Sequence, residues 1–148
     1  GGPAIAFNHA IRRAQGEIIG SIFADDLLEP DALENVIAAF AAHPQAAVIY
    51  GGCKSINEQG DVLSEFHPAP FNLMQLMSCK LVPPFSASFF SRDVCANRLY
   101  LDENSITELG FWLQLSHLPI VKVDQFFSHV RSSSKSRTFQ PEFYDRIC

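Results

Sequence analysis

The chain has 148 residues, a length typical of one domain with a hydrophobic core of its own. Hydrophobic residues make up 47% of it and charged residues 18%, which excludes a disordered tail, a collagen and a charged coiled coil. The net charge of -5 argues against a nucleic-acid partner. The longest apolar run, residues 36–42, is far shorter than the roughly 20 residues of a membrane span, so no transmembrane segment is expected.

The first half of the chain alternates between helical and strand patterns. Residues 4–14 have helical spacing and end near Gly16, a residue that helices favour just after their last turn. Residues 17–23 and 47–50 are short apolar runs of strand length, and two glycines close the second run. Between them a helix is predicted after Pro30, with one apolar face made of Leu33, Val36, Ile37 and Phe40. This order predicts an α/β fold with a largely parallel sheet.

The second half is predicted to add further short elements. They are a turn at 57–60 between 54–56 and 62–63, a helix at 71–79, a strand at 86–91, a turn at 102–104, a helix at 105–116, a strand at 120–123 and a polar loop at 132–137. No repeat or linker divides residues 1–148, so we expect a single domain. A parallel α/β fold normally opens with a strand, whereas this chain opens with a helix. The domain is therefore expected to be partial, with its N-terminal strands lying elsewhere or lost.

An acidic pair, Asp25 and Asp26, directly follows the predicted strand at 17–23. Ligands of open α/β sheets collect at the carboxyl ends of the strands. Two adjacent carboxylates repel each other unless a cation or protons compensate, and Mg²⁺ commonly links one or two carboxylates to substrate phosphates. The alternative is an acidic turn in which Asp26 caps the next helix.

Glu108 lies at the start of the predicted helix at 105–116. One interpretation is a capping box of the S-x-x-E type, with Ser105 as the helix cap. The other is a general base at the mouth of a helix.

His129 and Arg131 lie in a polar stretch after the last predicted strand. Both side chains can bind a phosphate, although a solvated surface loop is the simpler interpretation. The chain has no G-x-S-x-G, G-x-x-x-x-G-K-[ST] or G-x-G-x-x-G motif. These absences weaken the serine hydrolase, P-loop and dinucleotide-binding classes.

In chain order, these features resemble the family 2 inverting glycosyltransferases of the GT-A fold. The resemblance covers nearly the whole chain. It rests on residues 2–8 with 14–17 ("G…A-x-N…A-x-G-E"), 22–26 ("L-N/D-x-D-D"), 30–33 with 43–44 and 48–51 ("P-x-x-L…hP…vvyG"), 56–57 with 60, 102–103 with 107–115, and 128–136. Each motif alone is weak, whereas several in order with matching spacing are fairly specific.

The chain also departs from the family pattern. Phe23 stands where the family usually has Asp or Asn, Glu108 replaces the usual Asp base, and Gln114 replaces the usual Arg. His129 and Arg131 occur in swapped positions. The family's N-terminal strands, which hold the nucleotide base, are not matched.

The resemblance implies a GT-A-like, mostly parallel sheet flanked by helices. It implies transfer of a sugar, with inversion, from a nucleoside diphosphate sugar to a hydroxyl of a carbohydrate or lipid-linked acceptor. A divalent cation, Mg²⁺ or Mn²⁺, is expected on Asp26 and Asp25, and Glu108 is the expected catalytic base. Asn8, Asp25, His129 and Arg131 are the expected substrate-binding residues. Trp112 is expected in the core below the site.

Two other functions remain open. A truncated or degenerate, non-catalytic relative would explain Phe23 and the unmatched N-terminal strands. A metal-dependent phosphoryl-transfer domain would use the acidic pair but would leave Glu108 and the closing loop unexplained. The glycosyltransferase interpretation implies polysaccharide biosynthesis for the cell envelope, in the cytoplasm or at the inner face of the membrane. It also implies that the 148-residue chain alone transfers little sugar, whereas an N-terminally extended chain is active.

Overall fold

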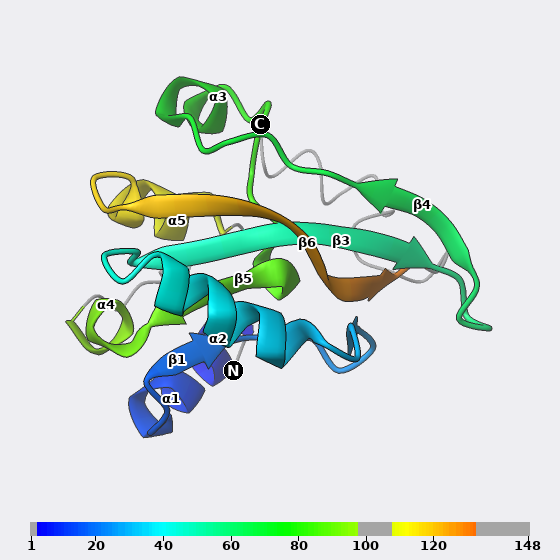
Figure 1. Ribbon diagram of the computed structural model, residues 1–148, viewed down its shortest axis with the longest axis horizontal. Coiled ribbons are helices and arrows are strands. Elements are labelled where there is room, and N and C mark those ends of the chain that lie inside the picture. Colours follow the sequence, from blue (N-terminus) through cyan, green and yellow to red (C-terminus); the bar gives the residue numbers. More distant parts are fainter. Residues whose placement is uncertain (1–2, 98–107, 133–148) are drawn as a thin grey trace.

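The computed structural model describes residues 3–97 and 108–132 (Figure 1). Its elements are α1 (Pro3–Arg13), β1 (Ile18–Gly20), β2 (Leu27–Leu28), α2 (Ala32–Ala42), β3 (Val48–Ile56), β4 (Val62–Phe66), α3 (Leu73–Met77), the 3₁₀ turn η1 (Phe85–Ala87), β5 (Ser88–Ser91), α4 (Arg92–Asn97), α5 (Leu109–Leu115) and β6 (Ile120–Arg131). The helices and strands predicted within this part are present, but the strands expected at 47–50 and 120–123 extend to residues 56 and 131, and β2, η1 and α4 are additional. The predicted turn at 102–104, the start of the helix at 105–107 and the loop beyond 132 lie outside it.

The strands of the described part form one sheet in the order β1-β5-β3-β6-β2, with β4 also paired to β3. Only β3 and β6 pair in parallel there, while β1–β5, β3–β5, β3–β4 and β2–β6 are antiparallel. The sheet is therefore mixed, and the expectation of a mostly parallel sheet is wrong for this part. The turn predicted between 54–56 and 62–63 joins β3 to β4 as an antiparallel hairpin, whereas the antiparallel pairings of β5 and of β2 with β6 were not expected from the helix–strand alternation.

Two apolar clusters pack on opposite faces of this sheet, because neighbouring strand residues point in opposite directions. One face is covered by α2, which lies in front of the start of β3 and of β5 in Figure 1. The other is covered by α1, α3 and α5. The α2 cluster is centred on Ala32, Val36, Ile49, Phe89 and Phe127. The second is centred on Val48, Leu76, Phe90, Phe111 and Trp112. Trp112 is fully buried, as expected for a core residue.

Strand β3 continues through Gly51 and Gly52, where the sequence indicated that the strand would end. The reason is the close approach of β6. A Cβ on Gly51 would collide with the backbone oxygen of Gln125, and one on Gly52 would lie 2.8 Å from the Phe126 ring. The β3–β6 register shifts at this point, and pairing then resumes. The glycines therefore let β6 cross a break in the ladder and extend to Arg131.

The apolar face of α2 is rotated from the predicted one. Ala32 and Val36 are buried, whereas Leu33 and Ile37 are 59% and 62% exposed. An apolar groove of about 450 Å³ lies between α2 and β1, and Leu33 and Ile37 form part of its wall. Within the described residues, the far edge of β1 has no strand beside it. None of the described helices is long and apolar enough to cross a membrane.

The glycine at the β3–β6 break gives a direct test of the fold. We expect Gly51→Ala to lower the free energy of unfolding by about 1–3 kcal/mol, because the added methyl group meets backbone that must shift. Gly110→Ala is the control, since a Cβ there meets nothing within 4 Å and α5 gains a better helix former. It should leave stability unchanged or raise it by up to about 1 kcal/mol. Urea denaturation measures both, and equal stabilities would contradict the β3–β6 packing.

Candidate functional site

The acidic pair lies in the turn between β1 and β2. Asp25 is exposed, whereas Asp26 is only 9% exposed. The Oδ1 atom of Asp26 accepts a hydrogen bond of 3.0 Å from the backbone N–H of Arg131. Burial raises the pKa of Asp26, and this effect outweighs the bond from Arg131, which lowers it. The helix-cap alternative for Asp26 is wrong, because Asp31 is the residue at the N-cap of α2.

Strand β6 brings the two expected phosphate-binding residues beside this turn. Leu27 of β2 pairs with His129, and the backbone N–H of Glu29 donates to the carbonyl of Phe127 at 3.0 Å. His129 and Arg131 are thus strand residues, and the prediction that they lie on a loop after the last strand is wrong. The strand runs on because both β3 and β2 pair with it.

The Arg131 side chain contacts backbone from two distant parts of the chain. Its Nε donates to the Asp25 carbonyl at 3.1 Å. Its Nη1 donates to the carbonyls of Asn57 and Glu58 at 2.7 and 3.0 Å. The guanidinium therefore joins the acidic turn to the turn between β3 and β4.

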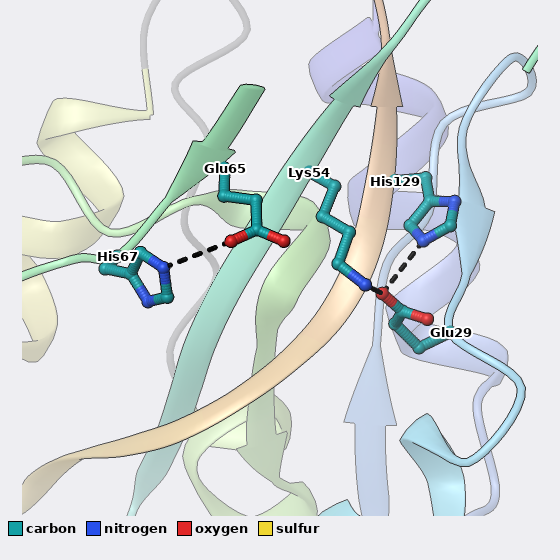
Figure 2. A network of polar contacts seen from close by, with 5 residues as sticks. All are labelled: Glu29, Lys54, Glu65, His67 and His129. Carbon is teal, nitrogen blue, oxygen red and sulfur yellow. Dashed lines mark ion pairs between the residues drawn. The ribbon is translucent and has the colours of Figure 1, made fainter. Parts of the chain in front are cut away.

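A second charged group lies next to this one (Figure 2). Figure 2 shows Lys54 of β3 and His129 of β6 pointing at one carboxylate oxygen of Glu29, at 2.6 and 2.8 Å. The His129 contact is an ion pair when the imidazole is protonated. The three side chains are only 13–23% exposed. Burial raises the pKa of Glu29, but Lys54 and His129 outweigh it and hold the pKa below its ordinary value.

Sequence analysis missed Glu29 and Lys54. Glu29 precedes Pro30 in what looks like an ordinary acidic turn, and Lys54 lies in a strand-and-turn stretch without a motif. Their pairing depends on the sheet order, which the local sequence does not encode. The neighbouring pair of Glu65 and His67, also drawn in Figure 2, is more exposed and 3.5 Å apart, so it contributes little.

Glu108 directly precedes α5 and is partly buried. Burial raises the pKa of its carboxyl group to about 7. Its side chain makes no cap bond to α5, whereas the capping-box interpretation pairs this carboxylate with the backbone of Ser105. Ser105 lies outside the described residues. Asn8 is buried in α1.

The structure therefore brings four of the expected site residues together: Asp25, Asp26, His129 and Arg131. Asn8 and Glu108 lie outside this set of contacts, and their roles remain predictions. The apolar groove is a separate feature, lined by Glu17, Ile18, Gly20, Ser21, Ile22, Leu28, Leu33, Val36, Ile37 and Phe89.

The donor set at the acidic turn suits a divalent cation that is shared with a substrate. No group of three or more His, Cys, Asp or Glu side chains within 3–97 and 108–132 could hold a metal ion. Two neighbouring carboxylates match Mg²⁺, which usually takes one or two protein carboxylates and completes its shell with phosphates and water. Asp25 and Asp26 are thus fitting but incomplete ligands.

The fold is that of a GT-A-type glycosyltransferase. The chain is similar to the crystal structure of S. aureus TarS (residues 1–349), with a TM-score of 0.61 and 17% identity over 88% of this chain and 40% of that chain. The chain belongs to Glycosyl transferase family 2, whose sequence model matches residues 1–97. The family and the fold inferred from the ordered motifs are thereby confirmed.

Several relatives are polysaccharide synthases by name. The chain is 34% identical over 70 residues to a chondroitin synthase and to a hyaluronan synthase of Pasteurella multocida, covering 47% of this chain and 7% of each relative. It is 29% identical over 77 residues to a chondroitin synthase of Escherichia coli, covering 52% of this chain and 11% of that protein. The chain therefore spans only a small part of each of these relatives.

The raised pKa of Glu108 predicts a specific dependence of stability on pH. A carboxyl group whose pKa rises on folding from an ordinary 4.5 to about 7 favours the folded state below pH 4.5. That contribution is lost as the pH rises through 7. We expect Glu108→Gln to be more stable than the wild type at pH 8, by on the order of 2 kcal/mol, and to lose this advantage below pH 4.5. Urea denaturation across this range measures the difference, and a difference independent of pH would contradict the assignment.

Proposed function

We propose that this site transfers a sugar from a nucleoside diphosphate sugar to an acceptor hydroxyl, with inversion at the anomeric carbon. One observation carries the proposal. In this chain of family 2, the turn between β1 and β2 holds exposed Asp25 next to buried Asp26, and the backbone of β6 donates a hydrogen bond to the Asp26 carboxylate. Negative charge on the leaving diphosphate must be stabilised as the glycosidic bond breaks. A cation bound at the acidic turn can provide that stabilisation.

The proposed roles of the acidic pair follow from their exposure. Asp26 is the direct cation ligand, because its Oδ1 is already fixed by the Arg131 N–H and its carboxylate cannot swing freely. Asp25 is exposed and contacts the ribose or the same cation. A bound Mg²⁺ or Mn²⁺ supplies Lewis-acid stabilisation of the diphosphate. His129, on the adjacent strand, is the proposed contact to the diphosphate oxygens. Arg131 was expected to share this role, but its guanidinium already donates to three backbone carbonyls.

Glu108 is the proposed general base. It takes the proton of the acceptor hydroxyl while the hydroxyl oxygen bonds to the anomeric carbon and the diphosphate departs from the opposite face. That geometry inverts the configuration. A carboxyl group with a pKa of about 7 is well matched to a base that works near neutral pH. Asn8 is retained as a proposed substrate contact.

The relatives' names support a saccharide acceptor. Two are chondroitin synthases and one is a hyaluronan synthase, so we propose a growing polysaccharide or a lipid-linked precursor as the acceptor. The proposed setting is cell-envelope polysaccharide synthesis in the cytoplasm or at the inner face of the membrane.

A non-catalytic relative is the second candidate, and Phe23 favours it. The Phe23 ring lies 6.5 Å from the Phe85 ring and offers no oxygen at the position where the family usually has Asp or Asn. Binding and transfer experiments separate the two candidates.

Cation binding tests the roles of the acidic pair. We expect Asp26→Asn to weaken Mn²⁺ binding by tenfold or more and Asp25→Asn to weaken it less, because only Asp26 is fixed by a backbone donor. The control is Asp31→Asn, an exposed acid beyond β2 that makes no cap bond to α2. Amide line broadening by Mn²⁺ measures all three affinities. Equal affinities in the wild type and every variant would contradict cation binding by this turn.

Transfer itself tests Glu108. In a chain extended at its N-terminus, we expect Glu108→Gln to lower kcat by about 10²- to 10⁴-fold, because the amide cannot take the acceptor proton. Glu108→Asp should retain part of the activity, and the wild-type rate should rise with pH through about 7. Full activity in Glu108→Gln would remove this residue from the mechanism, and an inactive extended wild type would favour the non-catalytic candidate.

A further inference from the structure

The turn between β3 and β4 is organised by one side chain. The Oδ1 atom of Asn57 accepts bonds from the backbone N–H groups of Gln59 and Asp61 at 3.0 and 2.8 Å. Its Nδ2 donates to the Asp61 carboxylate at 2.9 Å. The backbone N–H of Gly60, at a positive φ of 95°, donates to the Asn57 carbonyl at 3.2 Å. Such local bonds hold the 57–61 turn in one shape before anything docks on it.

The end of β6 docks on this turn. The backbone N–H of Ser132 donates to the Ile56 carbonyl at 2.8 Å, and the hydroxyls of Ser55 and Ser132 are hydrogen-bonded at 2.7 Å. Between these bonds and the acidic turn lies Arg131. Its guanidinium reaches the carbonyls of Asn57 and Glu58 with one nitrogen and the Asp25 carbonyl with another.

Residue 131 therefore contacts the acidic turn twice, in two different ways. Its backbone N–H fixes the Asp26 carboxylate, and its side chain fixes the Asp25 backbone. The same side chain is anchored to the 57–61 turn, so a movement of that turn is transmitted to the acidic pair. The planar guanidinium has several N–H donors in fixed directions, so it can donate to all three carbonyls at once.

We propose that Arg131 is a positioning residue that locks the 57–61 turn and the acidic turn into one rigid unit. This inference rests on the proposed function, because the carboxylates that the unit holds in place, those of Asp25 and Asp26, are the proposed cation ligands. The unit holds them from the side of β3. Asn57 then acts on the site through Arg131, because it shapes the carbonyls on which the guanidinium docks.

The positioning role and a role as a simple phosphate ligand predict different results for Arg131→Lys. Lysine binds phosphate as a point charge, so it would preserve much of a direct phosphate contact. It lacks the planar fork, so it cannot span the three carbonyls and would not preserve the lock. If Arg131 locks the two turns together, Asn57→Ala should have the same effect as Arg131→Lys, although Asn57 contacts neither the Asp25 nor the Asp26 carboxylate.

Amide hydrogen exchange of the 148-residue chain tests the lock without any ligand. The reporters are the N–H of Arg131, bonded to Asp26, and the N–H of Asp26, bonded to the Phe23 carbonyl at 3.1 Å. We expect Arg131→Ala and Arg131→Lys to speed exchange at both by about tenfold or more, and Asn57→Ala to speed it in the same direction. Unchanged protection at Ile49, in the core, shows that each variant is folded.

Two matched variants serve as controls. Arg92→Lys removes a guanidinium contact to the Gln15 carbonyl, and Asn72→Ala removes a side-chain bond to the Gln75 N–H at the start of α3. Neither residue contacts the acidic turn or the 57–61 turn, so both variants should keep wild-type exchange at Asp26 and Arg131. Wild-type exchange in Arg131→Lys, or in Asn57→Ala, would overturn the proposal.

Mn²⁺ titration of the same samples separates this inference from the proposed function. Accelerated exchange together with weaker Mn²⁺ binding in Arg131→Lys supports both. Accelerated exchange in a protein whose wild type shows no saturable Mn²⁺ binding supports the lock and contradicts the cation site. Unchanged exchange with intact Mn²⁺ binding overturns the lock and leaves the cation site standing.

Discussion

The candidate site depends on the shared direction of three strands. Strands β1, β3 and β6 run the same way, because β5 is antiparallel to both β1 and β3, while β6 is parallel to β3. Their carboxyl ends therefore face one end of the sheet. The acidic turn follows β1, the 57–61 turn follows β3, and Arg131 ends β6. A change in the β3–β6 register would move Arg131 away from both turns at once.

Charge at this end of the sheet is compensated in part within the protein. Glu29 holds Lys54 and His129 in a largely buried group, and the Arg131 guanidinium donates to backbone carbonyls beside the acidic pair. Buried charges are costly unless they are paired and hydrogen-bonded. These contacts also connect β2, β3 and β6 through side chains, so electrostatics and sheet pairing stabilise the same arrangement.

The sequence allowed the helices, most strands and the acidic turn to be predicted, because periodicity and turn residues are local signals. The ordered motifs also indicated the family. The two glycines, Gly51 and Gly52, were interpreted as the end of a strand, and this was wrong. The strand needs glycine there because β6, from a distant part of the chain, approaches closely. Glu29 and Lys54 were missed for the same reason, since only the sheet order brings them together. Local patterns do not encode such contacts.

The central claim is that a sugar-nucleotide site lies where β1, β3 and β6 end. The most direct measurement is an NMR titration of the ¹⁵N-labelled chain, extended at its N-terminus, with a panel of nucleoside diphosphate sugars in the presence of Mg²⁺. The account predicts saturable shifts for at least one donor, clustered at residues 25–29, 57–59 and 128–131. Saturable shifts confined to α3 and β4, or the absence of saturable shifts with every donor, would contradict it.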